Sequence, residues 1–350
     1  MTDAFAINCA SLDAWASAHI KGFAGPVVAK KFATGQSNPT YLLETPSGRY
    51  VLRRKPSGKL LKSAHAVERE FRVLRALGTV GFPAPPTLAL CEDESVIGSV
   101  FYVMGLVEGR IFWDPALPDL PRQERAAIFD SMNEALARLH AVDVGAIGLG
   151  DYGKPGNYFG RQLQRWSEQY RASETGGNAD MDRLMTWLGD HAPPDDGRVA
   201  LVHGDWRLDN MIFDNASPRL LAVLDWELST LGHPFADLAY QCMQWRLPNA
   251  MNARTQVGDS RGLGGIDRAA QGIPTESEYV AAYCRRAGIA DIPDWPFLLA
   301  FSFFRYAAIA QGVYKRSLDG NASSPERARK VGEAVPIMAQ LAIEIIDKGP

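Results

Sequence analysis

The sequence predicts an α+β fold of two lobes, a small lobe built on an antiparallel sheet followed by a larger, mainly helical lobe. Short apolar segments bounded by turn residues are concentrated in the first hundred of the 350 residues. From residue 121 onward, apolar residues recur at helical spacing, interrupted by one strand-rich stretch at 199–225. We therefore predict an N-terminal lobe over residues 1–106 and a C-terminal lobe over residues 107–350.

Composition narrows the class of protein. Hydrophobic residues make up 46% and charged residues 22%, as in a globular chain with a substantial core. The net charge of −3 and the lack of a basic stripe argue against a nucleic-acid partner. The longest apolar run, 295–304, is too short to cross a bilayer, so we expect a buried core helix and no membrane association.

The cysteines and the N-terminus bear on location. The four cysteines lie far apart and form no C-x-x-C pair, which indicates reduced thiols; they are Cys9, Cys91, Cys242 and Cys284. The N-terminal residues lack the basic stretch of a signal peptide. We therefore expect a cytoplasmic protein.

The N-terminal lobe is expected to contain four strands and one helix. The strands are predicted at 27–29, 40–44, 49–53 and 100–104, with a Pro-Ser-Gly turn at 46–48 before the third. The helix is predicted at 64–77, with Gly78 as its stop. Residues 105–109 read as the linker to the second lobe.

The C-terminal lobe is expected to be helical around one hairpin. We predict a helix at 122–140, a strand at 199–202, and a hairpin of strands 211–213 and 220–224 around a turn at 214–218. Residues 252–274 read as a mobile, glycine-bearing loop, and 275–278 as the capping box of a helix ending near Gly288. A later apolar helix contains Arg305, whose partner is either a structural carboxylate, which we favour, or an anionic group of a substrate.

The most informative motif is His-Gly-Asp-Trp-Arg-Leu-Asp-Asn at 203–210, followed by Asp-Trp-Glu at 225–227. Asp205 is suited to accept a proton from an attacking hydroxyl, while Asn210 and Asp225 offer oxygen ligands to Mg²⁺. The predicted hairpin brings these two ligands to one end. Protein kinases use the same order, H-R-D-x-x-x-x-N and then D-F-G, but here Gly204 replaces the arginine.

These motifs resemble the aminoglycoside phosphotransferase/choline kinase-like superfamily. The segments at 35–40, 52–56 and 224–227 are most similar to the kinase module fused to some acyl-CoA dehydrogenases. The resemblance covers residues 25–340 and implies a protein-kinase-like fold that uses ATP and Mg²⁺. It also implies that Asp237, in G-x-P-x-x-D-L-A, braces the catalytic loop.

The nucleotide half of the predicted site comes from the N-terminal lobe. Gly35, Gln36 and Ser37 lie in a turn that the resemblance places over the triphosphate. Arg53 occupies the position of the kinase phosphate-binding lysine, and an arginine there is not equivalent to lysine. Its partner is chosen by helical geometry, because Glu70 lies roughly 45° and Glu68 roughly 115° from the centre of the apolar stripe. We therefore expect Arg53 to pair with Glu70.

Three further residues complete the predicted nucleotide site. By resemblance to the kinase hinge, Met104 lines the adenine pocket, and the Gly105 carbonyl and Val107 amide contact adenine.

Two histidines near the motif could be taken for catalytic residues. We expect His233 to be a turn residue, since Asp205 already holds the base position, and His203 to pack within the loop.

The sequence thus predicts an ATP- and Mg²⁺-dependent phosphotransferase acting on a hydroxyl of a small molecule. Arginines crowd the region after the hairpin and no acidic cluster is evident, which favours a hydroxy acid or hydroxyacyl-CoA over a polycation. An aminoglycoside or other small-alcohol kinase remains an alternative. A non-catalytic nucleotide-binding pseudokinase is a further alternative, because Arg53 stands where kinases have lysine. A protein kinase has less support, because no A-P-E-like segment follows the motif.

Overall fold

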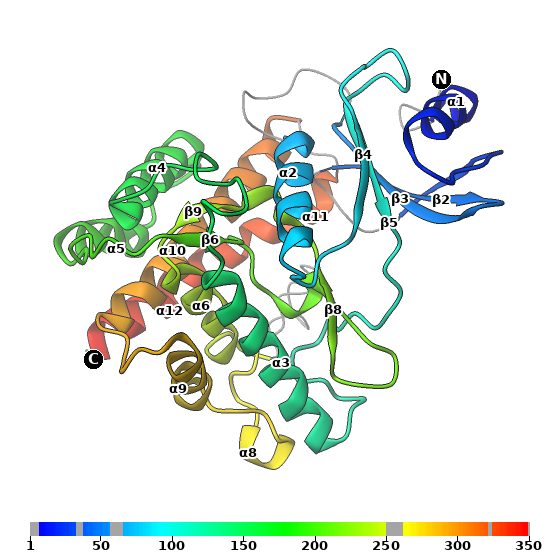
Figure 1. Cartoon of the computed structure of the whole chain (residues 1–350). Helices are drawn as coiled ribbons and strands as arrows, with labels where there is room; N and C mark the ends of the chain where they lie inside the picture. The colour runs from blue at the N-terminus through cyan, green and yellow to red at the C-terminus, as the bar shows by residue number, and fades with distance from the viewer. Residues whose placement is uncertain (1–6, 33–37, 57–65, 250–261, 321–323, 349–350) are drawn as a thin grey trace.

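The computed structural model describes residues 7–32, 38–56, 66–249, 262–320 and 324–348 (Figure 1). Its N-terminal part is a five-stranded antiparallel sheet with strand order β1-β2-β3-β5-β4. The strands are β1 (Val28–Lys31), β2 (Thr40–Thr45), β3 (Gly48–Arg54), β4 (Thr87–Cys91) and β5 (Phe101–Gly105). The α+β class and the antiparallel N-terminal sheet are confirmed.

One helix covers each face of this sheet, as Figure 1 shows. Successive strand residues point to opposite faces. Thus Leu52 packs in one apolar cluster with α1 (Cys9–His19), while Val51 packs in the main core with α2 (Val67–Thr79). Helix α2 therefore lies between the sheet and the rest of the molecule, where its side chains can reach both.

Two elements of this lobe were not predicted. The expectation of a single helix in the first hundred residues is wrong, because α1 precedes the sheet and is capped by Asn8. Its alanine-rich sequence buries only Leu12 and Ala16, so its apolar stripe is narrow. Strand β4 was missed as well; its pairing with β5 shifts register between Thr87 and Ala89, which obscures the alternation expected of a strand.

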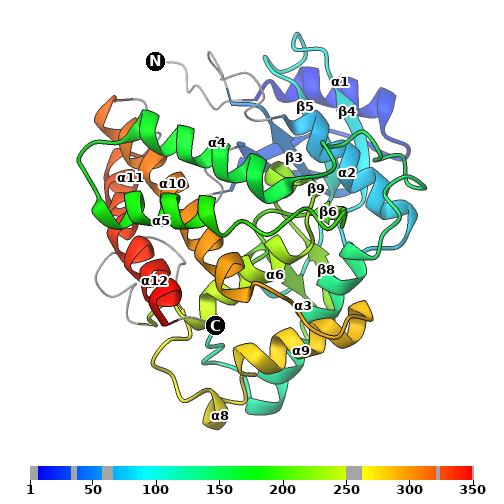
Figure 2. The same ribbon diagram turned by 90° about the vertical axis from the view of Figure 1, so that its left-hand side faces the viewer.

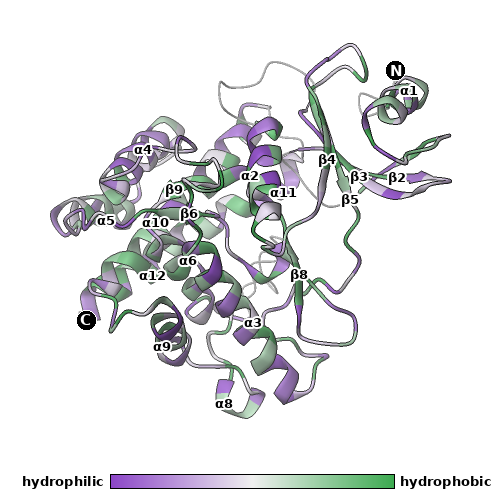
Figure 3. Ribbon diagram, in the orientation of Figure 1, coloured by the Kyte–Doolittle hydropathy of each residue, from purple (hydrophilic) through white to green (hydrophobic). Residues whose placement is uncertain are grey.

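The C-terminal part is mainly helical. Its α-helices are α3 (Arg122–His140), α4 (Tyr158–Ser173), α5 (Ala179–Asp190), α6 (Phe235–Cys242), α8 (Arg268–Gln271), α9 (Glu276–Ala287), α10 (Trp295–Leu318), α11 (Pro325–Gly332) and α12 (Ala334–Lys348). Helices α4 and α5 lie side by side, and α10 packs against α4, α6, α11 and α12 (Figure 2). Figure 3 shows hydrophilic stretches on the outward faces of helices such as α4.

Helix α10 is the centre of this lobe. It has 24 residues and is long and apolar enough to cross a membrane by length and composition alone. However, 72% of its most apolar window is buried inside the fold. It extends well beyond the apolar run seen in the sequence, and its burial agrees with the core helix that we predicted.

Short strands lie between α5 and α6 in the sequence. Strand β6 (Ala200–Val202) pairs with β9 (Thr230–Gly232), and β7 (Met211–Phe213) pairs with β8 (Leu220–Val223). Short 3₁₀ turns lie just before β7 (Leu208–Asn210), between β8 and β9 (Trp226–Leu228) and directly after α6 (Met243–Trp245). The predicted hairpin is thus present as β7–β8, and α9 has the predicted capping box at Thr275.

The predicted loop at 252–274 needs correction. Its first part, through residue 261, lies outside the described residues. The remainder is ordered: Leu263 is fully buried and donates its N–H to the Gln244 carbonyl, and α8 follows. Packing of one apolar residue against the core therefore fixes a segment whose composition suggested a mobile loop.

Candidate active site

The loop between β6 and β7 is held by a buried aspartate of α6. Asp237, which is fully buried, accepts the backbone N–H of His203 at 2.6 Å and that of Gly204 at 2.8 Å. Gly204 has φ +86°, and a Cβ there would lie 2.8 Å from the Leu228 carbonyl oxygen. An arginine, as in protein kinases, would not fit this backbone. The contacts of Asp237 agree with the bracing role implied by the family resemblance.

His203 supports the loop from inside. Its Nε2 donates to the Leu224 carbonyl at 2.8 Å, and its Nδ1 accepts the Asp205 backbone N–H at 3.2 Å. Both ring nitrogens are therefore used, and the side chain is fully buried. This arrangement makes His203 a packing residue of the loop, as expected, and links the loop to the end of the β7–β8 hairpin.

The side chains of Asp205 and Asn210 meet at the loop's open side. Asn210 Nδ2 donates to the Asp205 carbonyl at 3.0 Å and to Asp205 Oδ2 at 2.9 Å. Burial raises the pKa of Asp205, but the Arg207 charge and hydrogen bonds from Tyr240 and Asn210 outweigh it and hold that pKa below its usual value. Asp205 is therefore ionised at neutral pH, as a proton acceptor must be.

Asp225 lies at the same end of the hairpin as Asn210. Leu224 N donates to the Asn210 carbonyl at 2.8 Å, so the two strand ends are adjacent. Asp225 adopts a left-handed backbone, φ 63° and ψ 62°, which costs a non-glycine residue free energy and is often found at functional sites. This turn directs the chain from β8 back toward the N-terminal lobe.

The donor set at this end fits Mg²⁺. Because the Asn210 nitrogen donates to Asp205, its amide oxygen is the atom left to ligate a metal, and the Asp225 carboxylate at the same end of the hairpin is partly exposed. The described residues contain no group of three or more His, Cys, Asp or Glu side chains suited to a metal. Two oxygen ligands completed by nucleotide oxygens and water are what Mg²⁺ commonly accepts.

Arg53 reaches this end from the N-terminal lobe. Its Nε lies 2.9 Å from Glu70 Oε2, and a terminal nitrogen lies 2.6 Å from Asp225 Oδ1 and 3.6 Å from Glu227 Oε2. Asn38 adds a second contact between the lobes by donating to Glu227 at 3.3 Å. Burial lowers the pKa of Arg53, but the charges of Glu70 and Asp225 raise it by more than burial lowers it. The guanidinium therefore stays charged.

The choice between the two glutamates of α2 is resolved by these contacts. Glu70 is 2% exposed and pairs with Arg53, whereas Glu68 is 37% exposed and pairs with Lys55 at 2.9 Å. Burial raises the pKa of Glu70, and the Arg53 charge opposes that rise. The predicted ion pair is therefore present, and its phosphate-binding function stays a prediction.

The structure describes only some of the other residues predicted to contact the nucleotide. Gly35, Gln36 and Ser37 lie outside the described residues. Met104 is buried at the end of β5, Gly105 donates its N–H to the Pro86 carbonyl at 2.8 Å, and Val107 is partly buried just beyond. Their contacts with adenine stay predictions, as does the lobe boundary after residue 106, which falls between β5 and α3.

Three residues near Asp205 escaped the sequence analysis. Arg207 Nε lies 3.7 Å from Asp205 Oδ1, and the other end of its guanidinium donates to Asp209 Oδ2. Tyr240, buried in α6, contributes to the lowered pKa of Asp205. The position of Arg207, two residues after Asp205, was the available signal, but its partners depend on tertiary contacts.

The structure gives Arg305 different partners from the carboxylate that we expected. Arg305 does not bind a carboxylate in the described residues; it donates to the Gly204 carbonyl at 2.7 Å and lies over the Tyr240 and Trp166 rings. Arg246 pairs with Glu276, and Arg286 pairs with Asp130. These charges are satisfied within the protein, so their number does not by itself indicate an anionic acceptor.

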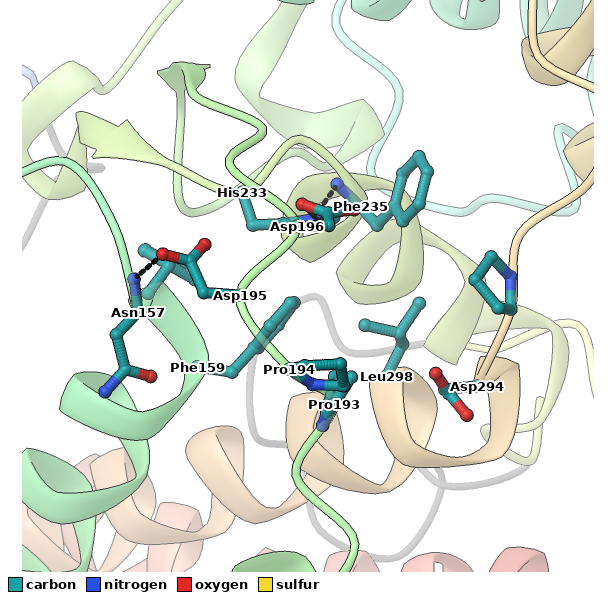
Figure 4. A pocket seen from close by; sticks show the side chains of 12 residues that line it. Asn157, Phe159, Pro193, Pro194, Asp195, Asp196, His233, Phe235, Asp294 and Leu298 are labelled. Atoms are coloured by element: carbon teal, nitrogen blue, oxygen red, sulfur yellow. Dashed lines mark hydrogen bonds and ion pairs between the residues drawn. The ribbon is translucent and has the colours of Figure 1, made fainter.

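His233 lies in a separate pocket (Figure 4). The pocket is lined by residues of α4, the 193–196 loop and the start of α10, and none of them belongs to the predicted site. His233 Nε2 lies 3.2 Å from Asp196 Oδ1. Burial lowers the pKa of His233, and Asp196 counters that effect. His233 is therefore a turn histidine with its own partner, as expected.

Comparison with known proteins identifies a matching family and several relatives. Residues 28–271 match the phosphotransferase enzyme family, which is about two thirds of the chain. Acyl-CoA dehydrogenase family member 10 of Mus musculus is 50% identical over 324 residues, covering 93% of this chain and 30% of that protein. Acyl-CoA dehydrogenase family member 11 of Rattus norvegicus is 44% identical, covering 90% of this chain and 40% of that protein. The chain thus spans less than half the length of these relatives.

Solved structures agree in fold. A crystal structure of a candidate aminoglycoside phosphotransferase from Ralstonia eutropha is 48% identical, with TM-score 0.88, covering 99% of this chain and all of that one. Aminoglycoside phosphotransferase APH(4)-Ia, in a ternary complex with ADP and hygromycin B, has TM-score 0.60 at 15% identity and covers 97% and 99%. The second likeness shows the fold alone, which is the predicted protein-kinase-like one.

Proposed function

The chain belongs to the phosphotransferase enzyme family, and on that premise we propose that it transfers phosphate from Mg²⁺-bound ATP to a hydroxyl of a small molecule. One observation carries the proposal. Asp205, Asn210 and Asp225 gather at one end of the hairpin, and Arg53 reaches the same point from the other lobe. An ionised base, two metal ligands and a phosphate-binding cation are the groups that phosphoryl transfer needs.

In the proposed reaction, Asp205 accepts the proton of the acceptor hydroxyl. The hydroxyl oxygen bonds to the γ-phosphorus, the bond from that phosphorus to the β,γ-bridging oxygen breaks, and ADP leaves. Asn210 and Asp225 would hold Mg²⁺, which would neutralise charge on the phosphate oxygens. Arg53, fixed by Glu70, holds the phosphates. A protein of the same fold is known in a ternary complex with ADP and hygromycin B, which supports a nucleotide substrate for this chain.

For the acceptor, we propose a hydroxy acid or a hydroxyacyl-CoA. Support comes from the relatives, which are named acyl-CoA dehydrogenase family members. No acidic cluster for a polycation is evident in the sequence. We also propose a cytoplasmic location, which is supported by four free thiols, Cys9, Cys91, Cys242 and Cys284.

A product assay tests the proposal. The protein is incubated with Mg-ATP and separate acceptors: hydroxybutyrates, their CoA thioesters, choline and kanamycin. Phosphate esters are identified by mass spectrometry and ADP release is measured. Phosphorylated hydroxy acid or thioester is the expected product. Robust kanamycin phosphorylation without any response to carboxylated alcohols would refute the acceptor class and leave the kinase function standing; nucleotide binding with no transfer to any acceptor would favour a pseudokinase.

A further inference from the structure

Arg207 is the charged residue nearest to the proposed base that the mechanism above does not use. Its Nε lies 3.7 Å from Asp205 Oδ1, and its terminal nitrogen donates to Asp209 Oδ2. The side chain of Asp209 is 7% exposed, whereas that of Arg207 is 22% exposed, the same as that of Asp205. Asp209 therefore holds the inner end of the guanidinium, while part of Arg207 remains open beside the base.

Arg207 has an unused hydrogen-bond donor. Its Nε is buried and has no hydrogen-bond partner among the described residues. The separation of 3.7 Å from Asp205 Oδ1 is too long for a hydrogen bond. A buried donor without a partner is unfavourable. The 22% of the Arg207 side chain that stays exposed is the part that a ligand oxygen next to Asp205 can contact.

The two oxygens of Asp205 face different neighbours. Oδ2 accepts from Asn210, the predicted metal ligand, and Oδ1 is the oxygen nearer to Arg207. Arg207 and the predicted metal ligand therefore approach Asp205 through different carboxylate oxygens. A molecule whose hydroxyl donates to Asp205 through Oδ1 would lie beside Arg207.

The other guanidinium near the loop has a different role. Arg305 is 5% exposed, donates to the Gly204 carbonyl, and has its charge centre 5.4 Å from the Tyr240 ring centroid. These contacts support the loop from within and leave little surface for a substrate. Arg207 is the more accessible of the two.

We propose that Arg207 determines acceptor specificity by binding a carboxylate or thioester carbonyl oxygen a few bonds from the hydroxyl that Asp205 deprotonates. This inference rests on the proposed kinase function and deepens it, because it assigns recognition of the acyl group to one side chain. Arg207 is suited to this because its planar guanidinium offers donors in a fixed direction toward an oxygen.

The test compares acceptors with and without an acyl oxygen. Hydroxybutyrates with the hydroxyl at each carbon, their CoA thioesters, and butanediol as the carbonyl-free acceptor are assayed with wild-type protein, Arg207→Met and Arg207→Lys. Arg219→Met is the matched control, since Arg219 is 70% exposed and pairs with Asp214 in the hairpin turn. The readout is the ratio of kcat/KM for each acyl acceptor to that for butanediol.

We expect Arg207→Met to lower this ratio roughly 10- to 100-fold, the effect of losing a hydrogen bond to a charged group. Arg207→Lys should lower it less, and Arg219→Met should leave it unchanged. A structural role would reduce both acceptors equally, so an unchanged ratio in Arg207→Met, or in Arg207→Lys if the first variant does not fold, overturns the inference. Wild-type protein that phosphorylates no acceptor would instead contradict the proposed function.

Discussion

At the scale of single residues, the ion pairs of Arg53 predict how strongly replacement of each partner should change stability and Mg-ATP affinity. Removing Arg53 leaves Glu70, which is 2% exposed, without its partner, and removing Glu70 frees Arg53 from its fixed position. Breaking a buried pair costs roughly 3–5 kcal/mol. Arg53→Ala and Glu70→Ala should therefore both reduce stability and Mg-ATP affinity strongly, whereas Glu68→Ala should change either property little.

Thermal unfolding and calorimetric titration with Mg-ATP measure both properties. Glu68→Ala serves as the control because Glu68 is more exposed and pairs with Lys55 instead. A mutant set in which Glu68 matters and Glu70 does not would overturn the assignment of the phosphate-binding pair.

His233 gives an expectation for pH. Burial lowers its pKa in the folded state, while Asp196 raises it and Arg198 and His140 lower it. A lowered pKa means that the unfolded chain binds the proton more readily. The stabilising effect of a neutral His233 is therefore present above about pH 6.5 and is lost as pH falls through the lower folded pKa.

Denaturant unfolding at a series of pH values between about 7.5 and 5 tests this. His233→Asn should flatten part of the decline in unfolding free energy, and His191→Asn, at an exposed position, should not. An identical pH dependence in wild-type protein and His233→Asn would contradict the expectation.

At the scale of elements, helix α6 and the catalytic loop form one unit through Asp237. Asp237→Ala leaves the N–H groups of His203 and Gly204 without acceptors, and each costs about 1–3 kcal/mol when buried. We expect a large loss of unfolding free energy and little residual transfer activity. Asp319→Ala, which removes an exposed partner of Lys315, should cost under about 1 kcal/mol. Comparable losses in the two variants would argue against the bracing role.

Elements with strong local signals could be predicted, and those defined by tertiary contacts could not. The β7–β8 hairpin has a turn between two apolar runs, and α9 has a complete capping box, so both were found. Helix α1 has only a narrow apolar stripe, and β4 has an irregular register, so both were missed. Site residues named by a motif could be listed, but the partners of Arg207 and Arg305 depend on elements distant in sequence.

At the scale of the whole molecule, the two lobes meet at the predicted metal site. Arg53 of β3 contacts Asp225, which follows β8, and Asn38 contacts Glu227. We expect Asp225→Ala to weaken Mg-ATP binding together with turnover, because it removes a metal ligand and the anchor of Arg53.

Calorimetric titration with Mg-ATP, repeated with EDTA to remove the metal, tests this expectation. Asp214→Ala changes a carboxylate at the opposite end of the same hairpin and should leave the affinity unchanged. Unchanged affinity in Asp225→Ala would argue that Asp225 only pairs with Arg53.

The most direct test of the whole account is the transfer rate of Asp205→Asn. Asparagine retains the size of the side chain but cannot accept the hydroxyl proton. We expect at least about a 100-fold loss of phosphorylated product, the usual contribution of a general base, with Mg-ATP affinity within a few-fold of wild type. Phosphorylated product formed by Asp205→Asn at near wild-type rate would contradict it.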